Sequence, residues 1–160
     1  MLATDKLSPR GVEILQQAEG LQVEVRNTLS PPELLQMIGN FHALIVRSST
    51  RVTEAVLEAG RNLKVVGRAG IGVDNVDVAA ASARGVLVMN TPGGNTITTA
   101  EHAISLLLAL SRSIPQATAS MKEGKWEKEK FVGVELYQKT LGIIGLGRIG
   151  SEVARRVKGM

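Results

Sequence analysis

The fold is decided by the stretch Thr140-Leu141-Gly142-Ile143-Ile144-Gly145-Leu146-Gly147-Arg148-Ile149-Gly150, close to the end of the sequence. Residues 141–144 are apolar on both faces, as in a parallel strand covered by helices, so we predict a short strand there. Gly145, Gly147 and Gly150 then match G-x-G-x-x-G, and a helix is predicted over residues 151–157. Such glycines permit a tight turn, close approach of a pyrophosphate and close helix packing, and the helix N-terminus offers N–H groups to phosphate. The pattern predicts the opening of a Rossmann dinucleotide-binding domain, with a simple glycine turn as the alternative.

This motif stands late in the chain. A complete dinucleotide site needs two βαβαβ halves and an acidic residue that contacts the ribose about 20 residues beyond the glycines. The sequence ends at Met160, inside or just after the helix that follows the motif. We therefore expect the chain to contain the start of a cofactor domain and not its body.

Strands and helices alternate along the first 90 residues. Short apolar runs predict strands at residues 2–4, 21–25, 43–46, 64–67 and 86–89. Capping residues and apolar periodicity predict helices that begin at Ser8, Ser30, Thr53 and Val76. This alternation is typical of an α/β fold with a doubly wound, flavodoxin-like parallel sheet.

A long helix is predicted from about Thr98 to Glu123, with a bend at Pro115 because proline lacks the N–H that a helix interior requires. Its segment 103–110 is apolar nearly all round, and such a helix must be covered on more than one side. We therefore expect two bodies joined by this helix. Apolar side chains would otherwise face water, so we also expect a homodimer formed through the 98–123 helix or by exchange of elements.

Three loops follow strands of the predicted sheet and carry polar or glycine residues, namely 47–50, 68–72 and 90–95. Ligands of open α/β sheets bind beyond the carboxyl ends of the strands, so these loops are expected to share one edge. Arg47 and Arg68 can each bind a carboxylate or phosphate through two hydrogen bonds, and the turn at Gly70 and Gly72 adds backbone N–H donors. The loops predict a site for a small anion. The alternative is that the arginines pair with surface acids and the glycines only form a turn.

Composition excludes several classes of function. The net charge of +4 comes from interspersed acidic and basic residues, unlike the clustered basic face of a nucleic-acid-binding protein. The most apolar run, 104–110, is far shorter than a membrane span. The chain has no cysteine, which agrees with a reducing compartment, and no metal-ligand motif. We expect a cytoplasmic protein with no metal site and without nucleic-acid or membrane partners.

Several segments together carry a resemblance that is more specific than the glycine motif alone. They are residues 45–48, 65–77, 88–92, 119–126 and the glycine motif itself. Over essentially all 160 residues the sequence resembles the NAD-dependent D-2-hydroxyacid dehydrogenases, and among them the members that oxidise 3-phosphoglycerate. The resemblance implies that residues 1–95 form most of a substrate-binding domain. It also implies that residues 96–160 hold the interdomain helix and the truncated start of the NAD-binding domain.

The resemblance implies roles for individual residues on the substrate side. Arg47 and Ser48 match positions that hold the charged groups of the substrate, and Asn95 matches a substrate-contacting asparagine. The turn from Gly70 to Gly72, which follows Arg68, matches the turn between substrate and nicotinamide. Inside that turn, Ile71 stands where some relatives have a cofactor-contacting threonine, so only its backbone is expected to contact the cofactor.

On the cofactor side, Arg148 and Ile149 match the pair that contacts the pyrophosphate, between the motif glycines Gly145, Gly147 and Gly150. The catalytic Arg, Glu and His of the family all come after the point where this sequence ends. We therefore expect no catalytic residue within this chain, and no activity from the chain alone.

The function that the resemblance implies is oxidation of a phosphorylated 2-hydroxy acid, 3-phospho-D-glycerate, at C2 with NAD, the entry step to serine. Two alternatives on the same fold stay open. One is another D-2-hydroxyacid dehydrogenase, acting on glyoxylate, hydroxypyruvate or a larger acid. The other is a non-catalytic binding or assembly module. A phosphoacceptor receiver domain is disfavoured because the third strand ends at Arg47, where an Asp would be needed.

Overall fold

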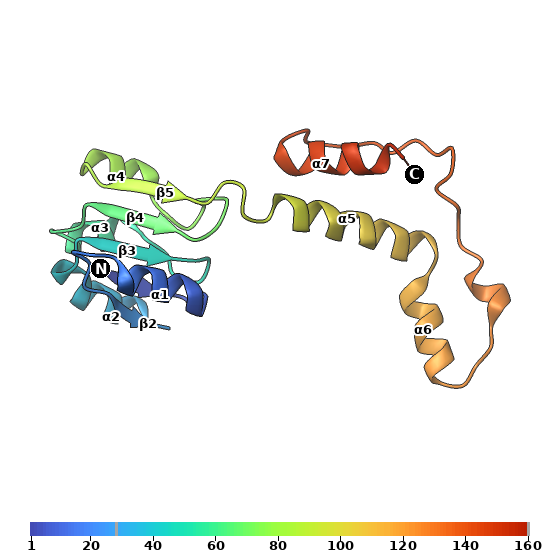
Figure 1. Cartoon of the computed structure of the whole chain (residues 1–160), viewed down its shortest axis with the longest axis horizontal. Helices are drawn as coiled ribbons and strands as arrows, with labels where there is room; N and C mark the ends of the chain where they lie inside the picture. Colours follow the sequence, from blue (N-terminus) through green and yellow to red (C-terminus); the bar gives the residue numbers. More distant parts are fainter. Residues whose placement is uncertain (28, 160) are drawn as a thin grey trace. The chain divides into compact units, whose positions relative to one another are not determined.

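The structure, a computed structural model, describes residues 1–27 and 29–159. The chain divides into two compact units, Met1–Gly94 and Asn95–Met160. The sequence analysis divides the chain between residues 95 and 96, and the assignment of the two parts to a substrate-binding and an NAD-binding domain stays a prediction. Figure 1 shows the elements of both units, and each unit is described by itself below.

The first unit is built on one sheet of five parallel strands in the order β2-β1-β3-β4-β5. The strands are β1 Leu2–Thr4, β2 Glu24–Arg26, β3 Ala43–Val46, β4 Val65–Arg68 and β5 Leu87–Asn90 (Figure 1). This order is that of the flavodoxin-like doubly wound fold, with its switch of direction between β1 and β3. The predicted fold class is confirmed. The second strand begins three residues later than predicted, and the others agree to within one residue.

Short helices connect the strands, and side-chain caps fix where three of them begin. The helices are α1 Pro9–Gln17, α2 Pro31–Met37, η1 Ile38–Asn40, α3 Glu54–Ala59 and α4 Val78–Ala83. The hydroxyl of Ser8 accepts a hydrogen bond from Gly11 N, at 3.1 Å, at the start of α1. A capping box opens α2, where Ser30 N donates to the Glu33 carboxylate at 2.8 Å, as the sequence predicts. Helix α4 begins at Val78 rather than Val76 because Asp77 caps it.

One face of the sheet holds the core of the first unit. Leu44, Val46 and Val66 are fully buried there, and they pack with residues of α2, α3 and α4, which contact one another. Side chains alternate between the faces of a strand, so Ile45 lies on the opposite face, where α1 lies. Helices therefore cover both faces of the sheet, and the parallel pairing holds the carboxyl ends of β1, β3 and β4 in a common register.

The second unit consists of helices and extended chain. Its elements are α5 Thr96–Ser111, α6 Ile114–Lys122, η2 Lys128–Phe131 and α7 Arg148–Val157. Helices α5 and α7 pack against each other. The guanidinium of Arg156 in α7 lies 3.7 Å from the carboxylate of Glu101 in α5.

The single bent helix predicted over 98–123 is wrong, because the structure has two helices. They are separated at Ser113, which adopts a left-handed conformation with φ of 49°. Proline at position 115 cannot donate to the carbonyl of Ser111, four residues earlier, so the helix cannot run through this point. Val134 N donates to that free carbonyl instead, at 2.8 Å.

The predicted strand at residues 141–144 is also wrong, because these residues are extended chain without strand pairing. A parallel strand requires a hydrogen-bonded neighbour, and the described residues of this unit provide none. Residues 141–145 instead border a hollow of about 420 Å³ with Ala103, Ile104 and Leu107 of α5, and the side chain of Ile144 is fully exposed.

Candidate functional site

The predicted strand-end loops of the first unit meet at the carboxyl edge of the sheet. Thr91 N donates to the carbonyl of Gly70 at 2.9 Å, and the Asn90 side chain donates to the carbonyl of Ile71 at 2.5 Å. The loop after β5 is therefore bonded to the glycine turn after β4. The glycine turn is also bonded to the end of β3, because Ala69 N donates to the carbonyl of Val46 at 2.9 Å.

A buried carboxylate fixes the loop of Arg47 and Ser48. Asp5, at the end of β1, accepts hydrogen bonds from Arg47 N at 2.8 Å, Thr50 N at 2.9 Å and the Thr50 hydroxyl at 2.6 Å. On the other side, the amide of Asn75 donates to the carbonyls of Arg47 and Thr50, both at 2.6 Å. Both polar side chains are buried, so the loop is held from two sides while the side chains of Arg47 and Ser48 stay exposed.

Asp5 and Asn75 were not among the residues singled out in the sequence, and neither was Lys6. A signal for Asp5 and Lys6 was present, because they follow β1, and every strand of a parallel sheet ends at the same edge. Asn75 gave no such signal, since it lies inside the connection between β4 and α4.

The side chain of Arg68 stabilises its own loop. Its guanidinium donates to the carbonyl of Gly72 at 2.6 Å and lies 3.6 Å from the carboxylate of Asp74. The Arg68 side chain is only 12% exposed. A Cβ atom on Gly70 would come within 2.8 Å of this guanidinium, so the glycine leaves room for it. Contact between Arg68 and a substrate stays a prediction.

The predicted site residues fall into two groups. Arg47, Ser48, Arg68 and the turn from Gly70 to Gly72, with Ile71 in it, lie together on the first unit. Asn95 belongs to the second unit, where it is the N-cap of α5. The glycine motif with Arg148 and Ile149 also belongs to the second unit.

The glycine motif has the backbone that a pyrophosphate-binding turn needs. Gly145 has a φ of 92°, which favours glycine, and Gly147 is the N-cap of α7. A Cβ on Gly147 would meet nothing within 4 Å, so space is open at the helix N-terminus. A Cβ on Gly150 would collide with the carbonyl oxygen of Gly145, so the turn closes tightly against the helix. These residues fit a dinucleotide pyrophosphate.

Charged side chains stabilise the helix that follows the motif. The Arg155 guanidinium donates to the Glu152 carboxylate at 2.6 Å, and Arg156 also pairs with it. Hydrogen bonds from Arg155 first, and then from Arg156, hold the pKa of Glu152 below its ordinary value. A lowered pKa means that this contribution to helix stability is present above the ordinary pKa of Glu and is lost as the pH falls through the folded value.

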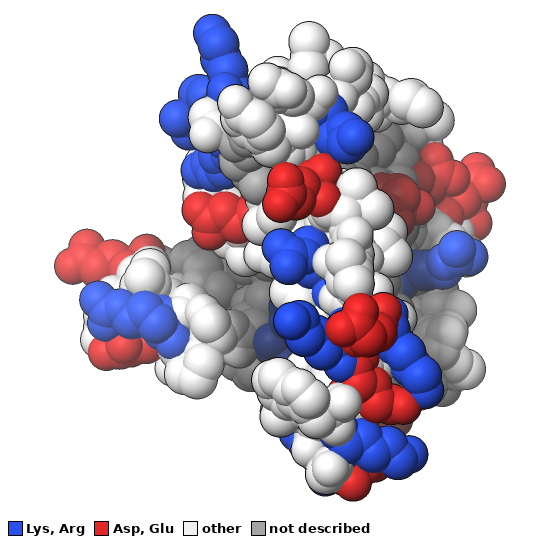
Figure 2. All heavy atoms as spheres, turned by 90° about the vertical axis from the view of Figure 1, so that its right-hand side faces the viewer, with Lys and Arg blue, Asp and Glu red and all other residues white. Residues whose placement is uncertain are grey.

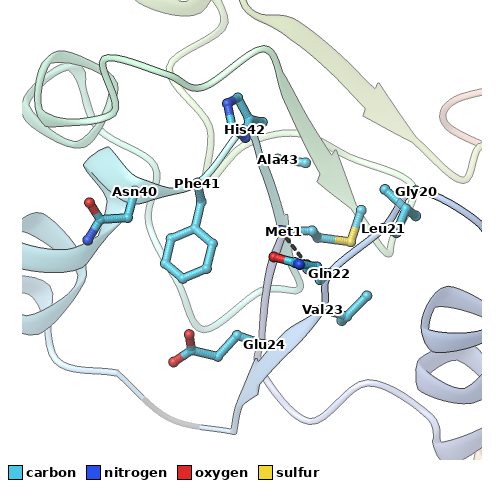
Figure 3. A pocket seen from close by; sticks show the side chains of 10 residues that line it. All are labelled: Met1, Gly20, Leu21, Gln22, Val23, Glu24, Asn40, Phe41, His42 and Ala43. Atoms are coloured by element: carbon cyan, nitrogen blue, oxygen red, sulfur yellow. Dashed lines mark hydrogen bonds between the residues drawn. The ribbon is translucent and has the colours of Figure 1, made fainter.

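A broad hollow of about 830 Å³ lies at the opposite, amino-terminal ends of β1 and β3 (Figure 3). Its lining includes Phe41, Asn40, His42 and Glu24. None of the predicted site residues lines it, and ligands of this fold class bind at the other edge of the sheet. We therefore place the candidate site at the carboxyl edge.

Three further observations on residues 1–27 and 29–159 bear on function. Within them, no group of three or more His, Cys, Asp or Glu residues could hold a metal ion. No helix in this part of the chain has the length and apolarity to cross a membrane. On the face shown in Figure 2, basic and acidic side chains are interspersed, without a large patch of one sign.

Residues 1–156 match the protein family described as "D-isomer specific 2-hydroxyacid dehydrogenase, catalytic domain". The chain belongs to this family. The family membership that the sequence resemblance implies is confirmed. Members of this family are similar to the chain both in sequence and in structure.

Among curated proteins, the chain is 51% identical over 160 residues to the D-3-phosphoglycerate dehydrogenase of Archaeoglobus fulgidus, covering all of this chain and 30% of that protein. It is 55% identical over 158 residues to the enzyme of the same name from Sus scrofa, covering 99% of this chain and 30% of that protein. The chain therefore spans about a third or less of these relatives.

Solved structures agree with this assignment. The TT0316 protein from Thermus thermophilus matches with a TM-score of 0.89 at 36% identity, over 99% of this chain and 52% of that one. The D-lactate dehydrogenase of Aquifex aeolicus, described as complexed with NAD and lactic acid, matches with a TM-score of 0.87 at 25% identity, over 99% of this chain and 48% of that one.

Proposed function

We propose that this chain contributes part of a cytoplasmic enzyme that oxidises 3-phospho-D-glycerate to 3-phosphohydroxypyruvate with NAD, at the entry to serine biosynthesis. The observation that carries the proposal is the exposed Arg47 on a rigid loop beside the glycine turn, at the carboxyl edge of a flavodoxin-like sheet. The names of the curated relatives support this substrate over other 2-hydroxy acids.

In this proposal the chain binds and orients the reactants. Arg47, with Ser48 and Asn95, holds the charged ends of the substrate, and the turn of residues 70–72 borders the nicotinamide. The turn of residues 145–150 and the first N–H groups of α7 hold the pyrophosphate. When bound, NAD accepts the hydride from C2 of the substrate. The proposal assigns no proton-transfer role to a residue of this chain.

The test is steady-state oxidation of 3-phosphoglycerate by the full-length enzyme, followed by NADH absorbance. Arg47→Gln is expected to raise KM for 3-phosphoglycerate by about 10- to 100-fold, because a hydrogen bond to a charged group contributes about 1.5–3 kcal/mol. Arg61→Gln, an exposed arginine at the amino edge, is the matched control and should leave KM unchanged.

The chain alone is expected to show no turnover. Turnover by the 160-residue chain, or a full-length enzyme that prefers glyoxylate or an unphosphorylated acid, would contradict the proposal.

We also propose that the chain forms a homodimer through α5. Leu106 and Leu110 of this helix are 57% and 78% exposed, and a group of apolar side chains so exposed favours association. Leu106→Glu with Leu110→Glu is expected to convert a dimer to a monomer, measured by light scattering during gel filtration. Leu21→Glu, at an exposed leucine of the first unit, should leave the dimer intact. A wild-type monomer at micromolar concentration would refute the proposal.

A further inference from the structure

A second hollow of about 560 Å³ lies where the direction of the sheet switches, between the ends of β1 and β3. Lys6 and Ser8 of the β1–α1 loop line one side of it, and Arg47 and Ala69 line the other. The apolar side chains of its lining are Leu7, Ile14, Leu15 and Ile45. In flavodoxin-like sheets this switch point is where ligands bind, so the hollow is the part of the carboxyl edge best placed to take one.

The charge of this lining is purely positive. Among residues 1–27 and 29–159, Lys6 and Arg47 are the only charged residues that line it. Neither forms an ion pair with an acidic side chain of residues 1–27 or 29–159, whereas the exposed Arg10, Arg26 and Arg84 each pair with a glutamate. Two unpaired cations on one small hollow create a positive potential that attracts an anion.

The backbone holds Lys6 in an unusual conformation. Asp5 and Lys6 have φ values of 65° and 46°, in the left-handed region that a residue with a long side chain seldom adopts. Three hydrogen bonds from the Arg47 loop to the Asp5 carboxylate over-determine this turn, so the same contacts position both cations. Backbone outliers of this kind gather at ligand sites, and glycine would be the residue of choice if only the turn were required.

We infer that Lys6 is a substrate-binding residue that acts with Arg47 to hold the phosphate group of the substrate. The inference rests on the proposed function for the identity of the substrate. A phosphate monoester carries close to two negative charges at pH 7, whereas a carboxylate carries one, so two unpaired cations match the phosphate better. Lysine is a good phosphate ligand because its ammonium is a compact point charge with three donors.

The first experiment uses the full-length enzyme. Lys6→Gln is expected to raise KM for 3-phosphoglycerate by about tenfold, as for loss of one hydrogen bond to a charged group, with kcat changed less than about twofold. KM for D-glycerate, the same acid without phosphate, is expected to stay the same. Lys64→Gln, at an exposed lysine on the amino edge, is the matched control. An unchanged KM for 3-phosphoglycerate in Lys6→Gln, or an equal rise for both acids, would overturn the inference.

The second experiment separates binding from folding. Lys6→Gly relieves the left-handed strain, so we expect a thermal midpoint at least as high as that of the wild type together with the same loss of phosphate selectivity. If 3-phosphoglycerate binds more weakly only in Lys6 variants with a lower thermal midpoint, Lys6 has a structural role and does not bind the substrate.

The third experiment does not depend on turnover. Titration of the 160-residue chain with inorganic phosphate, followed by amide NMR shifts of residues 5–8 and 47–50, is expected to show binding that Lys6→Gln weakens about tenfold. If the full-length enzyme fails to oxidise 3-phosphoglycerate while this titration succeeds, the proposed function is wrong and the phosphate site stands. If wild type and Lys6→Gln titrate alike, the site is wrong.

Discussion

Asp5→Ala is expected to lower the free energy of unfolding of the first unit by about 3 kcal/mol and to abolish ordered anion binding at Arg47. Asp5 is 8% exposed, and its carboxylate accepts three hydrogen bonds from the loop of residues 47–50. Alanine would leave the N–H groups of Arg47 and Thr50 without their acceptor, and each unsatisfied buried donor costs about 1–3 kcal/mol.

The measurement is amide hydrogen exchange by NMR, because it reports on this loop rather than on the whole chain. The amides of Arg47 and Thr50 should exchange about 100-fold faster in Asp5→Ala, the change expected for about 3 kcal/mol of local stability. Asp5→Asn should have a smaller effect, since an amide oxygen still accepts from these N–H groups.

Asp77→Ala is the matched control for removal of a carboxylate. Asp77 also accepts a backbone hydrogen bond, from Ala80 N at 2.9 Å, but it is an exposed cap of α4. We expect it to cost about 1 kcal/mol and to leave the amides of Arg47 and Thr50 unchanged. Protected amides at Arg47 and Thr50 in Asp5→Ala would mean that Asn75 alone holds the loop.

The first unit could be predicted well because its signals are local. Apolar runs such as 43–46, capping residues such as Ser30 and the repeated βα alternation each depend on a few neighbouring residues, and they agree with one another. The gathering of the loops at one edge then followed from the parallel sheet.

The contacts that hold the site could not be predicted in the same way. Asp5 is more than 40 residues away from Arg47 in sequence, and which backbone groups a carboxylate accepts from depends on loop conformation. Arg68 is an example of a contact that the sequence does not reveal. The residue type suits an anion ligand, but its guanidinium is bound within its own loop, which no spacing in the sequence reveals.

The two wrong predictions in the second unit share a physical cause. Residues 141–144 have the apolar side chains on both faces that a buried strand requires. A strand forms only when a neighbouring strand supplies its hydrogen bonds, however, and residues 141–144 have no such neighbour among the described residues. Likewise, the apolar periodicity of residues 98–123 continues past Pro115, yet the missing N–H decides the backbone there. In both places a requirement for a hydrogen-bond partner outweighed side-chain patterning.

Gly150→Ala is expected to destabilise α7 and to weaken NAD binding by the full-length enzyme about 100-fold. Alanine inside a helix normally stabilises it by about 0.5–1 kcal/mol relative to glycine, but here its Cβ would collide with the carbonyl oxygen of Gly145. Because that contact is with backbone, the glycine turn has to open. A displacement of about 1 Å at a ligand-positioning turn costs about two orders of magnitude. Calorimetric titration with NAD and thermal unfolding of the same samples measure the two effects.

Substitutions at two other glycines of the same stretch distinguish loss of space for the cofactor from distortion of the turn. A Cβ on Gly147 meets no atom within 4 Å, but it would enter the open space at the N-terminus of α7, so Gly147→Ala should weaken NAD binding with little loss of stability. Gly142 is equally open and lies before the turn, so Gly142→Ala should change neither property. If Gly150→Ala and Gly147→Ala bind NAD like the wild type, the turn does not hold the pyrophosphate. Only the turn brings backbone close enough to a phosphate for one added methyl group to weaken binding. If Gly142→Ala weakens NAD binding as much as Gly150→Ala and Gly147→Ala do, the effect therefore comes from the whole segment and not from the turn.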